Sequence, residues 1–142
     1  MTETIDLVEP WIYGQLMDDE LLTLVGGLDH ISGTLSVDEL PTPYVTFLMQ
    51  SSRDVQGNAG QIISTDNLYI VKAVAATASW DDVQPIAVIL TRLFHWPNRV
   101  IDVPGGSMTS TRENIIQYAE ITEGVQYRHL GAVYRIRASR DE

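Results

Sequence analysis

The chain has 142 residues, of which 44% are hydrophobic and 20% are charged, and its formal net charge is −10. This length and composition predict a single domain spanning residues 1–142, large enough to fold without disulfides or metal. The excess of acids opposes sequence-specific binding to a phosphate backbone. With no cysteine and no apolar run near the roughly 20 residues of a membrane span, the sequence predicts no disulfide scaffold, thiolate site or membrane association.

The first third of the chain has the pattern of two helices. Apolar residues recur at helical spacing from Ile5 to Leu16. Asp18 or Asp19 can cap a shorter helix, and Gly26-Gly27 supplies its left-handed stop. Residues 28–43 predict a loop or a short edge strand.

The middle of the chain has the pattern of a β-hairpin followed by a helix. Tyr44 to Arg53 alternates with the period of a half-buried strand, and residues 54–60 are the turn residues of a hairpin tip. Residues 61–77 are rich in β-branched side chains and predict the returning strand, with a bulge near Asp66-Asn67. A helix from Asp82 to Phe94 follows, opened by Asp81 and Asp82 with Pro85 in its first turn.

The last third predicts a second hairpin. Pro97-Asn98 stops the preceding helix, Pro104 to Ser107 forms a turn, and strands are expected at 113–121 and 125–138. In the last strand one face is expected to carry Leu130, Ala132, Tyr134, Ile136 and Ala138, leaving Val133, Arg135 and Arg137 on the other.

This order of elements predicts an α+β fold. Hairpins before and after one helix favour a mostly antiparallel sheet of about four strands with helices packed on one face.

Residues that could carry chemistry do not form a recognisable set. The three histidines, His30, His95 and His129, lack the spacing of a metal site. No GxSxG motif is present, and the single lysine, Lys72, lies in a predicted strand. We therefore expect no catalytic residues, no metal and no cofactor.

Charge is distributed unevenly along the chain. The first 52 residues contain nine acids and no Lys or Arg, whereas five of the eight arginines lie between Arg112 and Arg140. Segregation of this kind predicts that one part of the molecule meets an oppositely charged surface, such as another copy of itself. Arginine outnumbers lysine eight to one, which is also typical of interfaces.

The layout resembles the tail terminator (tail completion) proteins of long-tailed bacteriophages, which join head to tail. The resemblance runs from about Ile5 to Ala138 and is carried by the helix pair ending at Gly26-Gly27, the entry Leu40 to Thr46, the polar stretch Asp54 to Gly60, the helix Asp82 to Phe94 and the ending Tyr127 to Arg137.

The resemblance implies a structural virion protein, assembled in the host cytoplasm and located at the head–tail junction. Such a protein forms a homohexameric ring that caps the tail tube, stops its polymerisation and contacts the head connector, while DNA passes through the lumen without specific binding.

Seven residues are candidates for a subunit interface. Arg53, Asp54, Gln56 and Asn58 lie at the predicted hairpin tip, which in the family reaches a neighbouring subunit or the tube; an ordinary solvated loop is the alternative. Arg128, Arg135 and Arg137 lie on the last strand, where a subunit contact competes with exposed arginines that contribute little. Reversing Arg135 and Arg137 to Glu is expected to block ring formation and spare the fold.

Other functions remain open at this point. A head-completion or stopper protein of the same neck differs only in its partner. An acidic inhibitor or immunity-type protein would use the net charge of −10 to block a basic enzyme. An enzyme or ligand-binding domain is disfavoured because no acid, base and nucleophile can be assembled.

Overall fold

The computed structural model describes residues 5–33, 42–57 and 62–141. More than half of these residues lie in strands. The elements are α1 (Ile5–Gln15), α2 (Asp19–Val25), a 3₁₀ turn (Leu28–His30), β1 (Ile31–Ser32), β2 (Tyr44–Gln56), β3 (Ile62–Ala76), a second 3₁₀ turn (Trp80–Asp82), α3 (Gln84–Phe94), β4 (Trp96–Val103), β5 (Gly106–Thr122) and β6 (Val125–Arg140).

The helices follow their sequence signals closely. The Asp18 carboxylate caps α2 by accepting a hydrogen bond from the Leu21 amide, and Gly26 ends the helix at φ 103°. Helix α3 begins two residues later than predicted. Ser79, rather than Asp81 or Asp82, caps this region by accepting from the Asp81 amide, so the two acids form a 3₁₀ turn ahead of Pro85.

The predicted fold, α+β with a mostly antiparallel sheet of about four strands, is wrong: more than half of the described residues lie in strands, and they form one mixed sheet. The sheet has six strands in the order β1-β2-β3-β6-β5-β4, and β1 runs parallel to β2 while all other pairs are antiparallel. Strand β4 was missed because Pro97 and the positive φ of Asn98 interrupt its pairing, which covers Trp96 and resumes at Ile101.

Two strand ends also differ from prediction. Strand β5 begins at Gly106 instead of residue 113, because the polar residues of its first half alternate with buried Met108 and Ser110. Strand β2 continues to Gln56, so Arg53, Asp54 and Gln56 lie on a strand and not in a hairpin tip. The hairpin's register shifts fall between Met49 and Ser51 and between Val55 and Gln56, rather than at Asp66-Asn67.

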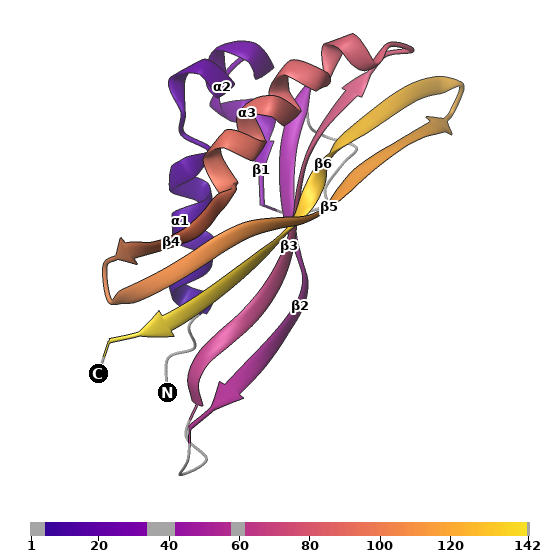
Figure 1. Ribbon diagram of the computed structural model, residues 1–142. Helices are drawn as coiled ribbons and strands as arrows, with labels where there is room; N and C mark the ends of the chain where they lie inside the picture. The colour runs from indigo at the N-terminus through magenta and orange to yellow at the C-terminus, as the bar shows by residue number, and fades with distance from the viewer. Residues whose placement is uncertain (1–4, 34–41, 58–61, 142) are drawn as a thin grey trace.

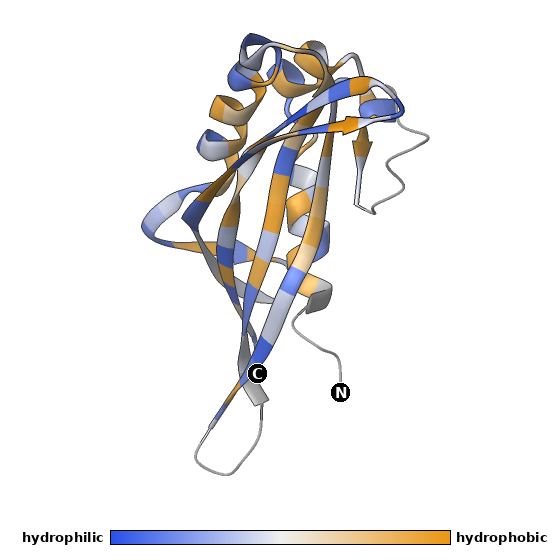
Figure 2. Ribbon diagram, turned by 90° about the vertical axis from the view of Figure 1, so that its right-hand side faces the viewer, coloured by the Kyte–Doolittle hydropathy of each residue, from blue (hydrophilic) through white to orange (hydrophobic). Residues whose placement is uncertain are grey.

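The core lies between the helices and one face of the sheet. Helices α1 and α3 contact β6, and α3 also packs on β3 and β5. The faces predicted for the last strand are confirmed: Tyr134 and Ile136 are buried in the core, whereas Arg135 and Arg137 point away from the helices. Figure 1 shows the three helices together on one side of the sheet, and Figure 2 shows hydrophobic and hydrophilic residues alternating along the strands.

The sheet is strongly twisted, so that its two long hairpins project in opposite directions, the β2–β3 hairpin at one end and the β5–β6 hairpin at the other (Figure 1). Gly131, near the middle of β6, permits a close approach of β6 to β3. A Cβ atom at this position would lie 2.2 Å from the Val71 carbonyl oxygen and 2.4 Å from the Lys72 Cα. The absence of a side chain at Gly131 is therefore a condition for the close packing of these two strands.

We predict that Gly131→Ala destabilises the fold by about 2 kcal/mol or more, because backbone atoms of β3 would have to move. Urea unfolding followed by circular dichroism measures the change. Gly14→Ala is the matched control: nothing lies within 4 Å of its Cβ position in α1, so it should leave stability unchanged or raise it by about 0.5–1 kcal/mol. Equal stability of the two variants would contradict the close strand approach.

Candidate subunit interface

The structure divides the interface candidates into separate places. Arg53, Arg135 and Arg137 gather around Asp66 on the sheet face opposite the helices. Arg128 lies toward the other end of β6, where its guanidinium covers the Trp80 ring at 5.1 Å and donates to the Ala78 carbonyl. Asp54 and Gln56 are further along β2. Asn58 lies outside the described residues.

Asp66 is the centre of the first group. In the strand register Asp66 faces Arg53 on β2 and Arg137 on β6, so three strands place these charges in one row. The Arg135 Nη1 atom lies 2.7 and 2.8 Å from the two Asp66 carboxylate oxygens. Arg53 and Arg137 approach the same carboxylate at 3.4 and 3.5 Å.

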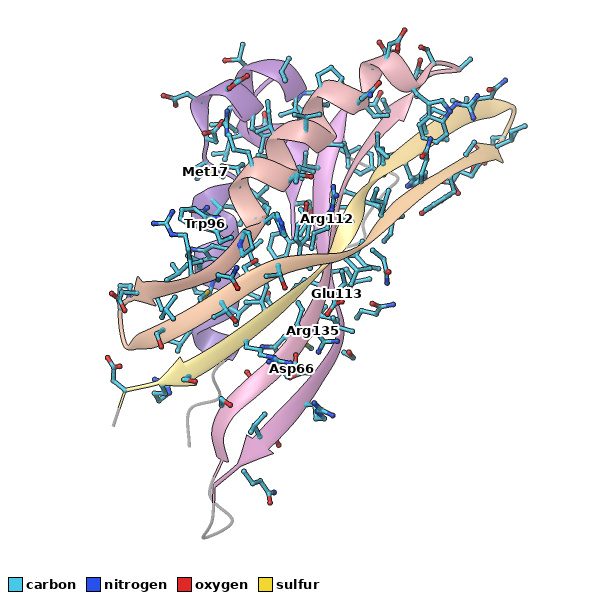
Figure 3. The ribbon with its side chains drawn as sticks, in the orientation of Figure 1. Met17, Asp66, Trp96, Arg112, Glu113 and Arg135 are labelled. Carbon is cyan, nitrogen blue, oxygen red and sulfur yellow. The ribbon has the colours of Figure 1, made fainter. Side chains whose placement is uncertain are left out.

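Glu113 extends this group to a fourth strand. A register shift between Arg112 and Asn114 makes Glu113 the extra residue of a bulge in β5, which directs its carboxylate to Arg135. The Arg135 Nε atom donates to Glu113 while Nη1 holds Asp66, and these hydrogen bonds raise the pKa of Arg135. Figure 3 shows Asp66, Glu113 and Arg135 together near the middle of the sheet. We call these five residues (Arg53, Asp66, Glu113, Arg135, Arg137) the Asp66 cluster.

The Asp66 cluster leaves positive charge facing outward. The Asp66 side chain is only 3% exposed, whereas those of Arg53 and Arg137 are 77% and 61% exposed. Three arginines against two carboxylates give a surplus of one positive charge. A shallow pocket of about 250 Å³ lies beside the cluster, lined by Ser51, Arg53, Asp66, Leu68 and Arg135. Arg53 and Arg137 are thus available to an acidic surface, while Arg135 is already engaged within the chain.

This geometry changes the expectation for Arg135. A glutamate at position 135 would stand against Asp66 and Glu113, so charge reversal there would disturb the fold as well as any interface. Arg53 and Arg137 are the better probes of association, since their contacts with Asp66 are long and their side chains are exposed.

Three acids of the N-terminal region already have partners within the chain. Arg92 on α3 donates to Glu20 at 3.0 Å and to Asp18 at 3.2 Å, joining α3 to the start of α2. The Glu9 carboxylate accepts a hydrogen bond from the Tyr69 hydroxyl at 3.0 Å. The charge asymmetry of the sequence therefore overstates the acidity left for a partner.

A second polar group lies on the β5–β6 hairpin and the facing part of β3; in the sequence, His129 and Lys72 were considered separately and were not predicted to belong to one group. His129 Nε2 is 2.5 Å from Glu120 Oε1, and the imidazole stacks on the Tyr118 ring with centroids 4.2 Å apart. Lys72 donates to the Tyr118 hydroxyl at 2.7 Å. Burial lowers the pKa of His129 below its ordinary value of 6.5, aided by Lys72 and opposed by Glu120. In the sequence, the signal for this group was the strand alternation that places Tyr118, Glu120 and His129 on the same face of the sheet.

Two features of the described residues bear on the kind of site. Within the described residues, no group of three or more His, Cys, Asp and Glu side chains is placed to hold a metal ion. None of the helices in this part of the chain has the length and apolar character needed to span a membrane.

Comparison with known proteins finds a structural match but no sequence match. No protein-family model matches the chain, and no curated protein is significantly similar to it. The structure superimposes on a chain of the virion of a native gene transfer agent (GTA) particle, with a TM-score of 0.63 and 16% sequence identity. The match covers 93% of this chain and 94% of that chain, so the two share a fold over essentially their whole length.

We predict that Asp66→Asn destabilises the protein by about 2 kcal/mol, because Arg53, Arg135 and Arg137 would lose the charged carboxylate that they share. The expected loss of stability is modest because the guanidinium groups reach solvent. Thermal and urea unfolding measure the loss. Asp54→Asn, on the exposed part of the neighbouring strand β2, is the control and should change stability by less than about 0.5 kcal/mol. A neutral effect at Asp66 would show that the cluster does not stabilise the sheet.

Titration of His129 gives a second prediction. Because its pKa in the folded state lies below 6.5, the unfolded chain takes up the proton first as the pH falls. The stability associated with neutral His129 is therefore complete above pH 6.5 and is lost as the pH falls through the folded-state pKa. In His129→Gln the free energy of unfolding should depend less on pH between 7 and 5 than in the wild type. An unchanged pH profile in His129→Gln would refute the assignment.

Proposed function

We propose that this protein is a structural component of a phage-like virion, and more specifically a tail terminator that closes the tail tube as a ring. The observation that carries the proposal is the fold shared over 93% of the chain with a component of the GTA virion. The layout of elements that resembles tail terminators points the same way. At 16% identity the structural match concerns the fold, so the role in the tail is our inference.

The geometry supports assembly of identical copies. Two long hairpins project from opposite ends of one twisted sheet, so each copy can reach two neighbours at once. Contacts of this head-to-tail kind close into rings when the rotation between copies allows it. Arg53 and Arg137 leave the Asp66 cluster with outward positive charge, which suits contact with an acidic surface of a neighbour or of the tube.

In this proposal the partners are five further copies, the tail tube protein and the head connector. The net charge of −10 favours free passage of DNA, because acids that line a lumen repel the phosphate backbone. The role is structural and needs no catalytic residue, cofactor or metal. Its site is the virion, at the junction of tail and head.

The direct test is assembly in the presence of tail tubes. The purified protein should form a particle of about 95 kDa, six times the 15.8 kDa chain, alone or on tube ends, and should stop tube growth when added to polymerising tube protein. Analytical ultracentrifugation and negative-stain electron microscopy measure both. A stable monomer that neither binds tube ends nor limits tube length would contradict the proposal, and binding to portal complexes instead of tubes would identify another neck component.

Charge removal provides a matched comparison. Arg53→Ala with Arg137→Ala should weaken ring formation by about tenfold while keeping the fold, since Arg135 still balances Asp66. The control is Arg99→Ala with Arg112→Ala, which removes the same charge from exposed positions elsewhere and should assemble normally. Equal assembly of the two double variants, measured by sedimentation, would remove the exposed arginines from the interface.

A further inference from the structure

Two edges of the sheet carry long stretches without a neighbouring strand among the described residues. Strand β1 pairs with β2 only at Val45 and Thr46, which leaves the outer edge of β2 open from Phe47 to Gln56. Strand β4 pairs with β5 only between Gly106 and Ser110, which leaves the outer edge of β5 open from Glu113 to Thr122. Open backbone donors and acceptors of this kind are a template for another strand.

The open part of β5 lacks the usual protection against such pairing. Its sequence from Asn114 to Thr122 contains no Pro, Lys or Arg and a single acid. Ile115, Tyr118 and Ile121 are 61%, 42% and 73% exposed. Soluble monomers normally interrupt an exposed edge of this composition with charge or proline. The composition of this edge is therefore typical of a surface that is buried when the protein assembles.

The open part of β2 has complementary features. Leu48, Met49 and Val55 are 36–39% exposed along this strand, and Arg53 is its one cation. Val55 and Arg53 lie on the sheet face away from the helices, where the β5 edge offers the exposed Tyr118 ring and the Glu120 carboxylate.

Strand direction also favours this partner. Strands β2 and β6 run in the same direction, because each is antiparallel to β3, and β5 runs opposite to both. When copies keep one orientation around an axis, β5 of one copy and β2 of the next are consequently antiparallel. A pairing of β5 with β5 would instead form a closed two-fold dimer, which uses up the β5 edge and leaves both β2 edges open.

We propose that copies of this chain associate by pairing the β5 edge, residues 114–122, with the β2 edge of the next copy, residues 51–56. This inference rests on the proposed ring-forming function. Within one copy, the strand register places Tyr118, the middle of the β5 segment, in the same cross-strand row as Tyr44 on β2. The middle of the open β2 segment lies about eight residues beyond Tyr44 along that strand. Neighbouring copies are thus staggered by on the order of 25 Å along the strands, which makes the strands oblique to the ring axis, as in a barrel.

Disulfide trapping tests the pairing. Because the native sequence contains no cysteine, every disulfide that forms must come from the introduced residues. Asp54 lies on the same sheet face as Gln117, Ala119 and Ile121, because Arg53 and Tyr118 occupy the other face. Asp54→Cys is combined in turn with Gln117→Cys, Ala119→Cys or Ile121→Cys to cover neighbouring registers. One combination should give a ladder of cross-linked species that ends at the ring size, since a disulfide requires Cβ atoms only about 4 Å apart.

The control combines Asp54→Cys with Val88→Cys, which is 64% exposed on α3 and should give on the order of tenfold less cross-linked product. Rings that form by mass while none of the three combinations cross-links would overturn the edge pairing and leave the proposed function intact. Dimers from Ala119→Cys alone would overturn it in favour of β5–β5 pairing. Absence of any assembly or tube binding would overturn the proposed function as well.

A charged substitution gives an independent readout. Ile121→Lys places a cation on the open β5 edge and should weaken association by about tenfold or more, with circular dichroism unchanged because the side chain is 73% exposed. Val88→Lys on α3 is the matched control and should assemble like the wild type. Normal rings from Ile121→Lys would overturn the proposal.

Discussion

The carboxylate of Asp66 is the interaction on which the arrangement of the sheet depends. It is nearly inaccessible to solvent and is held by Arg135, which also holds Glu113, so four strands share one network of charges. A buried carboxylate without cationic partners would be costly. The register that brings Arg53, Asp66 and Arg137 into one row is therefore favoured over slipped alternatives. With this register fixed, the two hairpins project at defined positions from opposite ends of the sheet.

Close backbone contact supplies the second constraint. Gly131 allows β3 and β6 to approach more closely than any side chain would permit. Among the described residues, the helices cover one face and no strand covers parts of the two outer edges. Such a molecule buries its own core but leaves backbone hydrogen-bonding groups at its sheet edges without a neighbouring strand. This is expected of a subunit that completes its sheet with a neighbour. The same architecture connects the fold shared with a GTA virion component to the proposed role in a ring.

The sequence predicted what depends on local signals and failed where distant residues decide. The cap at Asp18, the stop at Gly26 and the alternation in β6 were all visible, because each depends on neighbouring residues. Strand β4 was hidden by Pro97 and Asn98, and its pairing with β5 extends the sheet to six strands. The charges of Arg53, Arg135 and Arg137 were noticed, but their common partner Asp66 was not. That partner is set by the register across three strands, which composition and spacing do not encode.

The segregated charges of the sequence are therefore used in two ways. Arg92 and Arg135 stabilise the chain itself, whereas Arg53 and Arg137 remain exposed enough to serve association. The most direct measurement of the central claim is a cryo-electron microscopy reconstruction of the protein assembled on tail tubes. Our account predicts a ring of identical copies at the tube end, in which β5 of each copy continues antiparallel into β2 of the next. A ring whose copies meet through their helices, with the β5 edge exposed to solvent, would contradict it.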